Sequence, residues 1–328
     1  MCLKNKKVTI LVPCYNEGKT IPLFYKEVCE VIRKNDNFEW ELLFVNDGSN
    51  DNTLSVIEMI QKKDGRVAYV DLSRNFGKEA AMLAGFDYCR GNATIIMDAD
   101  LQDPPDMIPK MLKYWEEGFD DVYAKRQSRG RESWLRKKMS LFYYSLLQKM
   151  THIDILPNVG DFRLLDRKCI ESLKALRESE RYTKGLFCWI GFKKKELLFD
   201  RGNRIEGTSA WNFTKLIHLA MEGITSFTTA PLRISTFMGF IVSIIAFIYM
   251  CKVWVKALIW GDPVAGYPSL AMIILFLGGV QLLSLGIIGE YLSRIFHETK
   301  NRPPYIIRKY VEGNMGKNVD STCRGYDS

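Results

Sequence analysis

The stretch TIIMDADLQDPP, residues 94–105, places two aspartates directly after a short apolar run. Thr94–Met97 has the length and composition of a buried strand, and Asp98 and Asp100 follow it at once. In parallel α/β sheets, ligands bind beyond the carboxyl ends of the strands. Two carboxylates there suit a divalent cation that bridges the oxygens of a diphosphate. Taken alone, an Asp-x-Asp pattern is more often a solvated turn, so its place at a strand end decides the interpretation.

Apolar runs followed by polar clusters recur through the first half of the chain. Runs of strand length are Val8–Val12, Leu42–Val45, Val67–Leu72, Thr94–Met97 and Val122–Ala124. Stretches with a helical pattern lie between them, at Ile21–Arg33, Thr53–Lys62, Lys78–Cys89 and Pro105–Glu117. Strands that alternate with helices of this length predict an α/β fold with a mostly parallel sheet. Because the strands are apolar throughout, we expect both faces of the sheet to be covered.

Composition and charge restrict the class of protein. A chain of 328 residues allows about two domains, and 47% hydrophobic residues exclude a disordered chain. A net charge of +8 predicts an anionic partner: a phosphate, a nucleic acid or a lipid headgroup. Eight cysteines without a Cys-x-x-Cys pair give no support to a zinc knuckle, and three dispersed histidines give none to a histidine-rich metal site.

Two long apolar segments dominate the second half. Phe237–Cys251 carries no charge, and its apolar pattern continues to Trp260; Leu270–Gly289 is also uncharged. Because a membrane-spanning helix needs about 20 mostly apolar residues, we predict two transmembrane helices, at about 235–260 and 269–292. The alternative is a pair of buried helices in a soluble domain.

The charges around these segments predict their orientation. The loop 261–268 contains an aspartate but no lysine or arginine, whereas 294–309 and the stretch before the first segment are basic. By the positive-inside rule, both termini lie in the cytoplasm. The expected organisation is a cytoplasmic domain at 1–230, two helices within 231–293 and a basic tail at 294–328.

Two further segments have an amphipathic helical pattern. Residues 131–150 interleave bases with aromatic and aliphatic side chains, and 209–223 share the pattern. We interpret both as interfacial helices that lie on a membrane; the alternative is amphipathic helices packed on the core. Seven bases occur between Lys125 and Lys138, and the interleaved aromatics favour a lipid phosphate over nucleic acid.

Four single residues are further candidates for a role in binding or catalysis. Asp47 could accept hydrogen bonds from a nucleotide base or ribose, or could belong to an ordinary turn and helix cap. Glu17 could bind ribose hydroxyls. Lys78 begins a helix, where a cation is unfavourable, so we expect an anion nearby rather than a solvated lysine. Asp161 could face a bound acceptor or simply pair with Arg163.

The motifs resemble those of a known family. VPCYNE (12–17), VNDGSNDNT (45–53), SRNFGKEAAMLAG (73–85), DADLQDPP (98–105) and NVGDFRLLDR (158–167) resemble the GT-A-fold, family 2 inverting glycosyltransferases. More narrowly, they look like polyprenyl-phosphate glycosyltransferases related to dolichol-phosphate mannose synthase. EGITSF, PLRI, GYPSL, LFLGGVQLLSLGIIGEYLSRI and ETKNRPPYII look like bacterial bactoprenol glucosyltransferases. The resemblance covers about residues 7–310, and the QxxRW motif of processive synthases is absent.

The resemblance implies a role for each matching residue. Asp161 matches the proposed catalytic base, and Asp98 and Asp100 match the ligands of Mg²⁺ or Mn²⁺, with Asp100 also counted as catalytic. The residues that match contacts to the nucleotide sugar are Pro13, Tyr15, Glu17, Asp47, Lys78, Asp98, Ala99, Asp100, Arg204 and Ser209. Those that match the region of the acceptor phosphate are Arg126, Arg129, Arg136 and Ser140.

The reaction implied by the resemblance is transfer of a hexose, in the first place glucose from UDP-glucose, to undecaprenyl phosphate at the cytoplasmic face of the bacterial inner membrane. UDP-N-acetylhexosamine, GDP-mannose and a UDP-pentose stay open as donors. A membrane-anchored protein that binds nucleotide or lipid without turnover is the alternative of another class. The expected partners are the nucleotide sugar, undecaprenyl phosphate, the bilayer and further copies of the chain. A flippase and a second glycosyltransferase are expected downstream, and nucleic acid is not expected.

The base role of Asp161 has a chemical alternative. A phosphate monoester has a second pKa of about 6, so the acceptor is largely dianionic at neutral pH and scarcely needs a base. Asp161 could instead orient arginines or the sugar.

Overall fold

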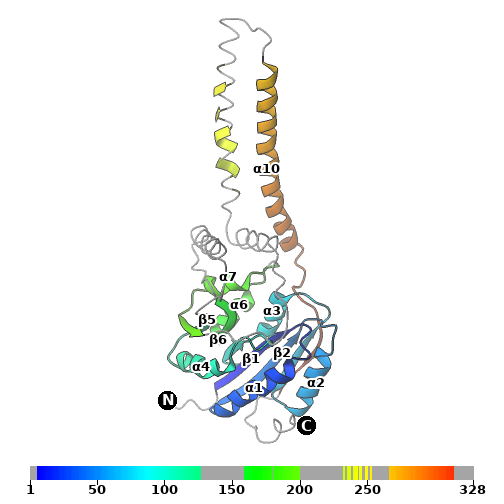
Figure 1. The fold of residues 1–328 in the computed structure, drawn as a ribbon, viewed down its shortest axis with the longest axis vertical. Helices are drawn as coiled ribbons and strands as arrows, with labels where there is room; N and C mark the ends of the chain where they lie inside the picture. Colours follow the sequence, from blue (N-terminus) through cyan, green and yellow to red (C-terminus); the bar gives the residue numbers. More distant parts are fainter. Residues whose placement is uncertain are drawn as a thin grey trace. The chain divides into compact units, whose positions relative to one another are not determined.

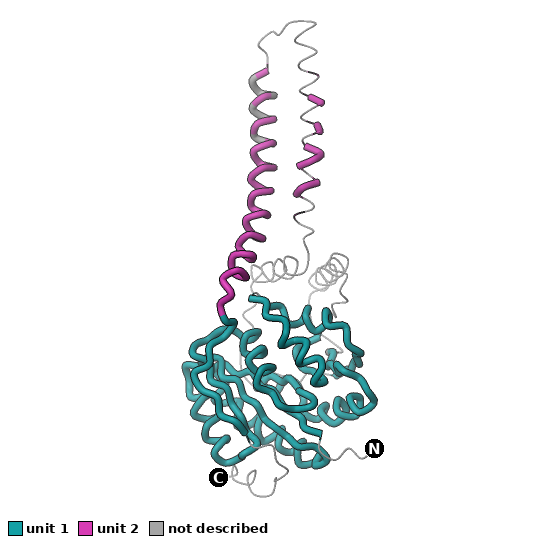
Figure 2. The backbone as a smooth tube through the Cα atoms, turned by 180° about the vertical axis from the view of Figure 1, so that it is seen from behind, with its two compact units in different colours: residues 1–148, 153–212, 303–328 teal, residues 149–152, 213–302 magenta. Residues whose placement is uncertain are grey.

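The computed structural model describes residues 6–126, 159–179, 181–199 and 266–313, together with short pieces between 232 and 252. The chain divides into two compact units (Figure 2). The first unit comprises residues 1–148, 153–212 and 303–328, and the second comprises 149–152 and 213–302. The C-terminal residues therefore return to the first unit.

Among the described residues, an eight-stranded sheet forms the centre of the first unit (Figure 1). Its strands are β1 (Lys6–Cys14), β2 (Phe38–Asn46), β3 (Val67–Leu72), β4 (Ala93–Ile96), β5 (Asp121–Arg126), β6 (Val159–Asp166), β7 (Lys194–Phe199) and β8 (Ile307–Val311). They lie in the order β7-β5-β6-β4-β1-β2-β3-β8. The neighbours β3, β2, β1 and β4 are parallel, whereas β6 is antiparallel to β4 and β5, and β8 is antiparallel to β3. The predicted α/β fold is confirmed.

The edge strands β7 and β8 have no continuous apolar run, and the sequence analysis did not single them out. Their sequences, KKELLF and IRKYV, carry charged side chains, as edge strands commonly do because one side is solvated. The structure also corrects the assignment of residues 294–328 to a tail. Ile307–Val311 pair with β3, so this part of the C-terminal segment completes the sheet.

Helices cover both faces of the sheet. They are α1 (Ile21–Lys34), α2 (Thr53–Lys63), α3 (Lys78–Tyr88), the short 3-10 helix η1 (Pro105–Met107), α4 (Ile108–Glu116), α6 (Arg167–Ala175) and α7 (Thr183–Trp189). The helices from α1 to α4 follow the predicted ranges closely, with η1 and α4 together filling the fourth. Ile21, Phe24, Val28 and Ile32 are buried on α1, with the spacing that places them on one face.

Alternate side chains of β1 enter two apolar layers. Ile10 and Val12 belong to the core cluster that also contains residues of α1, α2 and α4. Leu11 points to the opposite face, where α3 packs. A Cβ atom at Gly85 of α3 would lie 2.2 Å from Cδ1 of Leu11, so only glycine permits this close approach of helix and strand. The prediction that both faces of the strands are covered is confirmed.

The second unit contains the long helix α10 (Tyr267–Thr299). Within it, the 24 residues Phe276–Thr299 are long and apolar enough to cross a membrane, by length and composition, and the most apolar 18 of them are not buried. Described residues between 232 and 252 are helical, but most of the first predicted span lies outside the described part of the chain. The proposed interfacial helices at 131–150 and 209–223 also lie outside it.

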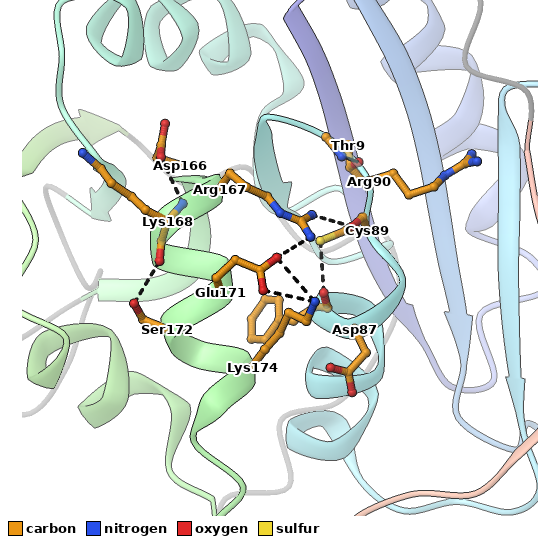
Figure 3. A network of polar contacts seen from close by, with 12 residues as sticks. Thr9, Asp87, Cys89, Arg90, Asp166, Arg167, Lys168, Glu171, Ser172 and Lys174 are labelled. Atoms are coloured by element: carbon orange, nitrogen blue, oxygen red, sulfur yellow. Dashed lines mark hydrogen bonds and ion pairs between the residues drawn. The ribbon is translucent and has the colours of Figure 1, made fainter.

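A polar network joins the start of α6 to the end of α3 (Figure 3). Asp166 caps α6 by accepting a hydrogen bond from the backbone N–H of Lys168 at 3.1 Å. The other carboxylate oxygen of Asp166 accepts from the indole N–H of Trp115 at 2.8 Å. Arg167 donates to the carbonyl of Cys89 at 2.7 Å. The end of β6 is therefore held against two helices.

Replacing Asp166 by alanine should lower the free energy of unfolding by about 1 kcal/mol, because α6 loses its cap. The indole of Trp115 also loses its acceptor, which adds to the loss. Asp166→Asn keeps a side-chain oxygen that can accept the capping hydrogen bond. Its unfolding temperature should therefore lie between those of wild type and Asp166→Ala. Thermal unfolding of the full chain in detergent measures this order, and equal transitions for wild type and Asp166→Ala would contradict the assigned cap.

Candidate active site

Three loops follow the carboxyl ends of the parallel strands β1, β2 and β4. Each contains a residue with left-handed backbone, namely Asn16 (φ 57°), Gly48 (φ 59°) and Leu101 (φ 55°). For a residue such as Leu101, this conformation costs about 1–2 kcal/mol. Such outliers gather at functional sites, where the surrounding structure holds them. Leu101 directly follows Asp98–Asp100, which supports a ligand site at this edge of the sheet.

Hydrogen bonds tie the loop after β1 to the loop after β2. The pairs are Asn16 N with Ser49 Oγ (3.0 Å), Asn50 N with Asn16 Oδ1 (2.9 Å), Glu17 N with Thr53 Oγ1 (2.8 Å) and Gly18 N with Asp51 Oδ2 (3.2 Å). Asp51 Oδ1 also accepts from the backbone N–H of Thr53, the first residue of α2, at 3.0 Å. The turn-and-cap interpretation therefore describes this part of the motif.

Asp47 holds the loop that leads into α3. Its Oδ1 accepts from the backbone N–H of Phe76 at 2.7 Å, and its Oδ2 accepts from that of Gly77 at 2.9 Å. Burial raises the pKa of this carboxyl, while the two hydrogen bonds oppose the rise. At the adjacent Gly48, a Cβ atom would lie 2.3 Å from the backbone carbon of Arg74. Each oxygen of Asp47 thus already has a backbone donor, and its evident contribution is to fix the approach to Lys78.

The ammonium of Lys78 lies between two carboxylates from other elements. Its Nζ is 2.6 Å from Oδ1 of Asp98, in the loop after β4, and 2.7 Å from Oδ2 of Asp161, on β6. The anion expected beside this helix-start lysine is therefore the chain's own pair of acids. Burial alone would lower the pKa of Lys78, but the two carboxylates raise it above its ordinary value. Lys78 is a permanent cation at neutral pH.

Asp161 is ionised although it is largely buried, with a side chain 13% exposed. Burial alone would raise its pKa, but Lys78, and after it Lys184, hold the pKa below its usual range. Its Oδ1 is buried and has no hydrogen-bond partner among the described residues. One carboxylate oxygen is thus engaged by Lys78, and the other has no hydrogen bond within the described part of the chain.

Arg163 forms its ion pair with Asp121 rather than with Asp161. The distance between Nη1 of Arg163 and Oδ2 of Asp121 is 3.1 Å, and both side chains are buried. The guanidinium also lies over the ring of Phe187, 3.8 Å from its centroid. The alternative in which Asp161 is merely the partner of Arg163 is therefore wrong.

Asp100 and Gln102 bring further side-chain oxygens to the loop that contains Asp98. Oδ1 of Asp100 accepts from the backbone N–H of Gln102 at 3.1 Å. Gln102 is 2% exposed, and neither polar atom of its amide has a partner among the described residues. Burial, followed by the charges of Asp100 and Asp98, raises the pKa of Glu17 and marks a concentration of negative charge. The sequence analysis gave Gln102 no role, because tertiary packing decides its burial.

This set of oxygen donors fits a divalent cation. Mg²⁺ and Mn²⁺ prefer carboxylate, carbonyl and water oxygens, and Mg²⁺ is commonly held by one or two carboxylates plus substrate phosphates. Across the described residues, no group of three or more acidic, histidine or cysteine side chains could hold a metal by itself. A cation at Asp98 and Asp100 would therefore need oxygens from a bound ligand or water.

The remaining predicted site residues divide into two groups. Pro13 lies in β1, Tyr15 is 44% exposed just after it, and Ala99 is buried between the two aspartates. Outside the described part of the chain lie Arg129, Arg136, Ser140, Arg204, Ser209 and the side chain of Arg126. The first group lies at the end of β1 and in the loops described above, and the assignments of the second group stay predictions.

Comparisons with known proteins show the family of the chain. The model of glycosyl transferase family 2 matches residues 9–174, and that of the GtrB C-terminal hairpin matches residues 230–295. The bactoprenol glucosyl transferase of Shigella phage SfII is 44% identical over 308 residues, which cover 94% of this chain and 99% of the relative. A prophage bactoprenol glucosyl transferase homolog of Escherichia coli K12 is 43% identical over 92% of this chain and 99% of the relative.

A solved structure is also similar, at a greater distance. Glucosyl-3-phosphoglycerate synthase from Mycobacterium tuberculosis, in complex with phosphoglyceric acid, aligns with a TM-score of 0.43 and 17% identity. The alignment covers 68% of this chain and 79% of that chain.

Replacing Lys78 by methionine should let Mn²⁺ bind on the order of tenfold more tightly in the absence of nucleotide. The ammonium would no longer compete for Asp98, and two like charges would be left facing each other. Titration calorimetry or the Mn²⁺ paramagnetic resonance signal measures this affinity. Lys110→Met, at an exposed position on α4, is the control and should bind Mn²⁺ as wild type does. Unchanged or weaker binding by Lys78→Met would show that Lys78 does not compete with the cation.

Proposed function

This chain belongs to glycosyl transferase family 2, and from that premise we propose that it transfers glucose from UDP-glucose to undecaprenyl phosphate. Relatives named for bactoprenol glucosyl transfer align with more than nine tenths of its length. The structural observation that carries the proposal is the cluster of Lys78, Asp98 and Asp161, in which Asp98 follows the carboxyl end of β4 and Asp161 lies near the start of the antiparallel β6. It combines a permanent cation for phosphate with carboxylates for a metal and a sugar.

Asp98 and Asp100 would hold the divalent cation, with the amide oxygen of Gln102 beside them. When bound, the cation would neutralise charge on the diphosphate and stabilise the departing UDP. Both Mg²⁺ and Mn²⁺ suit these oxygen atoms. Tyr15, which is exposed at the end of β1, would contact the nucleotide together with Glu17.

Lys78 would change partners when the donor binds. Its Nζ sits within hydrogen-bond distance of Asp98 and Asp161, so a small displacement brings it to a phosphate oxygen. Asp98 is then released from its ion pair. Asp161 keeps the lysine aligned because one carboxylate oxygen remains its partner. The other oxygen of Asp161, unpartnered among the described residues, would accept a hydrogen bond from a sugar hydroxyl.

The chemical step needs no base. A phosphate oxygen of the acceptor forms a bond to the anomeric carbon, from the face opposite UDP. The bond from that carbon to the β-phosphate oxygen of UDP breaks, and its electron pair leaves with UDP. Because the acceptor phosphate is largely dianionic at neutral pH, charge balances without transfer of a proton. We therefore assign Asp161 a positioning role, although the resemblance implies that it is the base.

The hydrophobic acceptor explains why the enzyme carries a membrane hairpin. A polyprenyl tail stays in the bilayer, so the phosphate must be met at the membrane surface. We propose that α10 and the preceding span hold the chain there, with both termini and the catalytic domain in the cytoplasm. Arg126, Arg129, Arg136 and Ser140 are the proposed contacts of the acceptor phosphate, and Arg204 and Ser209 the proposed closing loop over the donor.

The proposed reaction can be tested with the purified full chain in detergent, undecaprenyl phosphate and Mg²⁺. UDP-glucose, UDP-N-acetylglucosamine and GDP-mannose are offered separately, and a lipid-linked sugar is sought by mass. We expect product from UDP-glucose, lost with EDTA and reduced at least about a hundredfold in Asp100→Asn. The exposed Asp106→Asn is the matched control. Product from another donor alone would show that the transferred sugar is that donor's and not glucose. No product from any donor would overturn the proposal.

Asp161→Asn separates positioning from base catalysis. The neutral amide holds Lys78 less firmly, so we expect the KM for UDP-glucose to rise several-fold while kcat stays within about tenfold of wild type. A general base contributes about 10²–10⁴ in rate. A loss of kcat in that range, with donor binding unchanged, would instead identify Asp161 as the base.

A further inference from the structure

The strand that follows the membrane helix closes over the end of β3. β8 pairs with β3 in antiparallel register, with an irregularity between Asp71 and Leu72. Just beyond β3, the backbone N–H of Ser73 donates to the carbonyl of Ile306 at 2.8 Å. Ser73 also begins the loop that contains Phe76 and Gly77 and ends at Lys78. The C-terminal segment thus contacts the start of a loop that shapes the active site.

Arg308 of β8 binds two groups at this point. Its Nη1 is 3.3 Å from Oδ2 of Asp71, and its Nη2 donates to the carbonyl of Ser73 at 2.8 Å. The planar fork of an arginine can hold two acceptors in a fixed geometry, which a lysine cannot do. The guanidinium therefore sets the direction in which the chain leaves β3.

Asp71 connects Arg308 to the loop that follows β2. It is 1% exposed, and its Oδ1 accepts from the side-chain amide of Asn46 at 2.7 Å. The other amide atom of Asn46, Oδ1, accepts from the backbone N–H of Ser49 at 3.3 Å. Asn46 directly precedes Asp47, whose carboxylate holds the backbone at Phe76 and Gly77. Arg308 is thus linked by hydrogen bonds to both loops that lead to the nucleotide side of the site.

We propose that Arg308 is a positioning residue for the donor site, acting through Asp71 on the loops after β2 and β3. The inference rests on the proposed function, because Lys78, directly after the loop that follows β3, is the proposed contact of the donor's phosphate. Arg308 is 59% exposed, so its ion pair adds little to overall stability. Its effect is on geometry, since it orients a buried carboxylate and a loop carbonyl at once.

Lys309 provides a matched control on the same strand. It is the next residue, similarly exposed, and its Nζ pairs with Glu58 of α2 at 2.9 Å. Replacing either residue by glutamine removes one cation and one exposed ion pair from β8. Only the Arg308 contact leads to Asn46 and Ser73, so a difference between the two variants reports on the loops rather than on the strand edge.

The experiment compares wild type, Arg308→Gln, Arg308→Lys and Lys309→Gln as full chains in detergent. We measure the Kd of UDP with Mn²⁺ by calorimetry, the KM and kcat for UDP-glucose, and thermal unfolding. For Arg308→Gln we expect the Kd and KM to rise about five- to tenfold, with kcat changed less than about twofold. Arg308→Lys should recover part of the loss, and Lys309→Gln should match wild type. Unfolding temperatures should be alike for the two glutamine variants.

Several results would overturn the inference. One is an Arg308→Gln protein that binds UDP as tightly as Lys309→Gln does. Another is a loss of kcat alone, which would place the effect outside donor binding. Should Arg308→Gln unfold below the assay temperature, the decision passes to Arg308→Lys, which keeps the charge and must still weaken UDP binding. A wild type that binds UDP but transfers no sugar would refute the proposed reaction while the Kd comparison still tests Arg308.

Discussion

The active site depends on one ammonium that meets two carboxylates from different strands. Asp98 and Asp161 reach Lys78 from the end of β4 and from β6, which are antiparallel neighbours in the sheet. The half-exposed Asp98 and the largely buried Asp161 both contact Lys78, and these two like charges would repel each other without the cation. The lysine therefore allows the sheet to bring these acids together before any ligand arrives. In the proposed function, the same ammonium would contact the diphosphate of the donor.

Contacts made by the neighbouring loops and helices hold this cluster in place. The carboxylate of Asp47 fixes the loop before Lys78, and the close packing of Gly85 on Leu11 fixes the helix that follows it. At the edge of the sheet, Arg308 also contacts Asp71 and the carbonyl of Ser73, although it lies far from them in the sequence. A membrane enzyme built this way has its C-terminal strand and its donor loops within one compact unit.

In the proposed reaction, the chemistry of the acceptor removes the need for a general base. A phosphate dianion is already a nucleophile, so the enzyme has to offset the negative charge of donor and acceptor rather than remove a proton. Lys78, as a cation, offsets part of this charge, a divalent cation at Asp98 and Asp100 would offset more, and the ionised Asp161 holds the lysine in place. The long apolar helix α10 would hold the enzyme at the bilayer, where the tail of the acceptor stays.

The sequence by itself determined the strands with continuous apolar runs, the helices between them, the position of Asp98 and Asp100 at a strand end, and the apolar helix near the C-terminus. These signals are local, because hydrophobic periodicity and strand-end polarity are properties of neighbouring residues. Only the tertiary structure decided that Lys78 pairs with Asp98 and Asp161, and that Arg163 pairs with Asp121. It alone decided that β8 completes the sheet. Such pairings depend on register between strands distant in sequence, which no local pattern encodes.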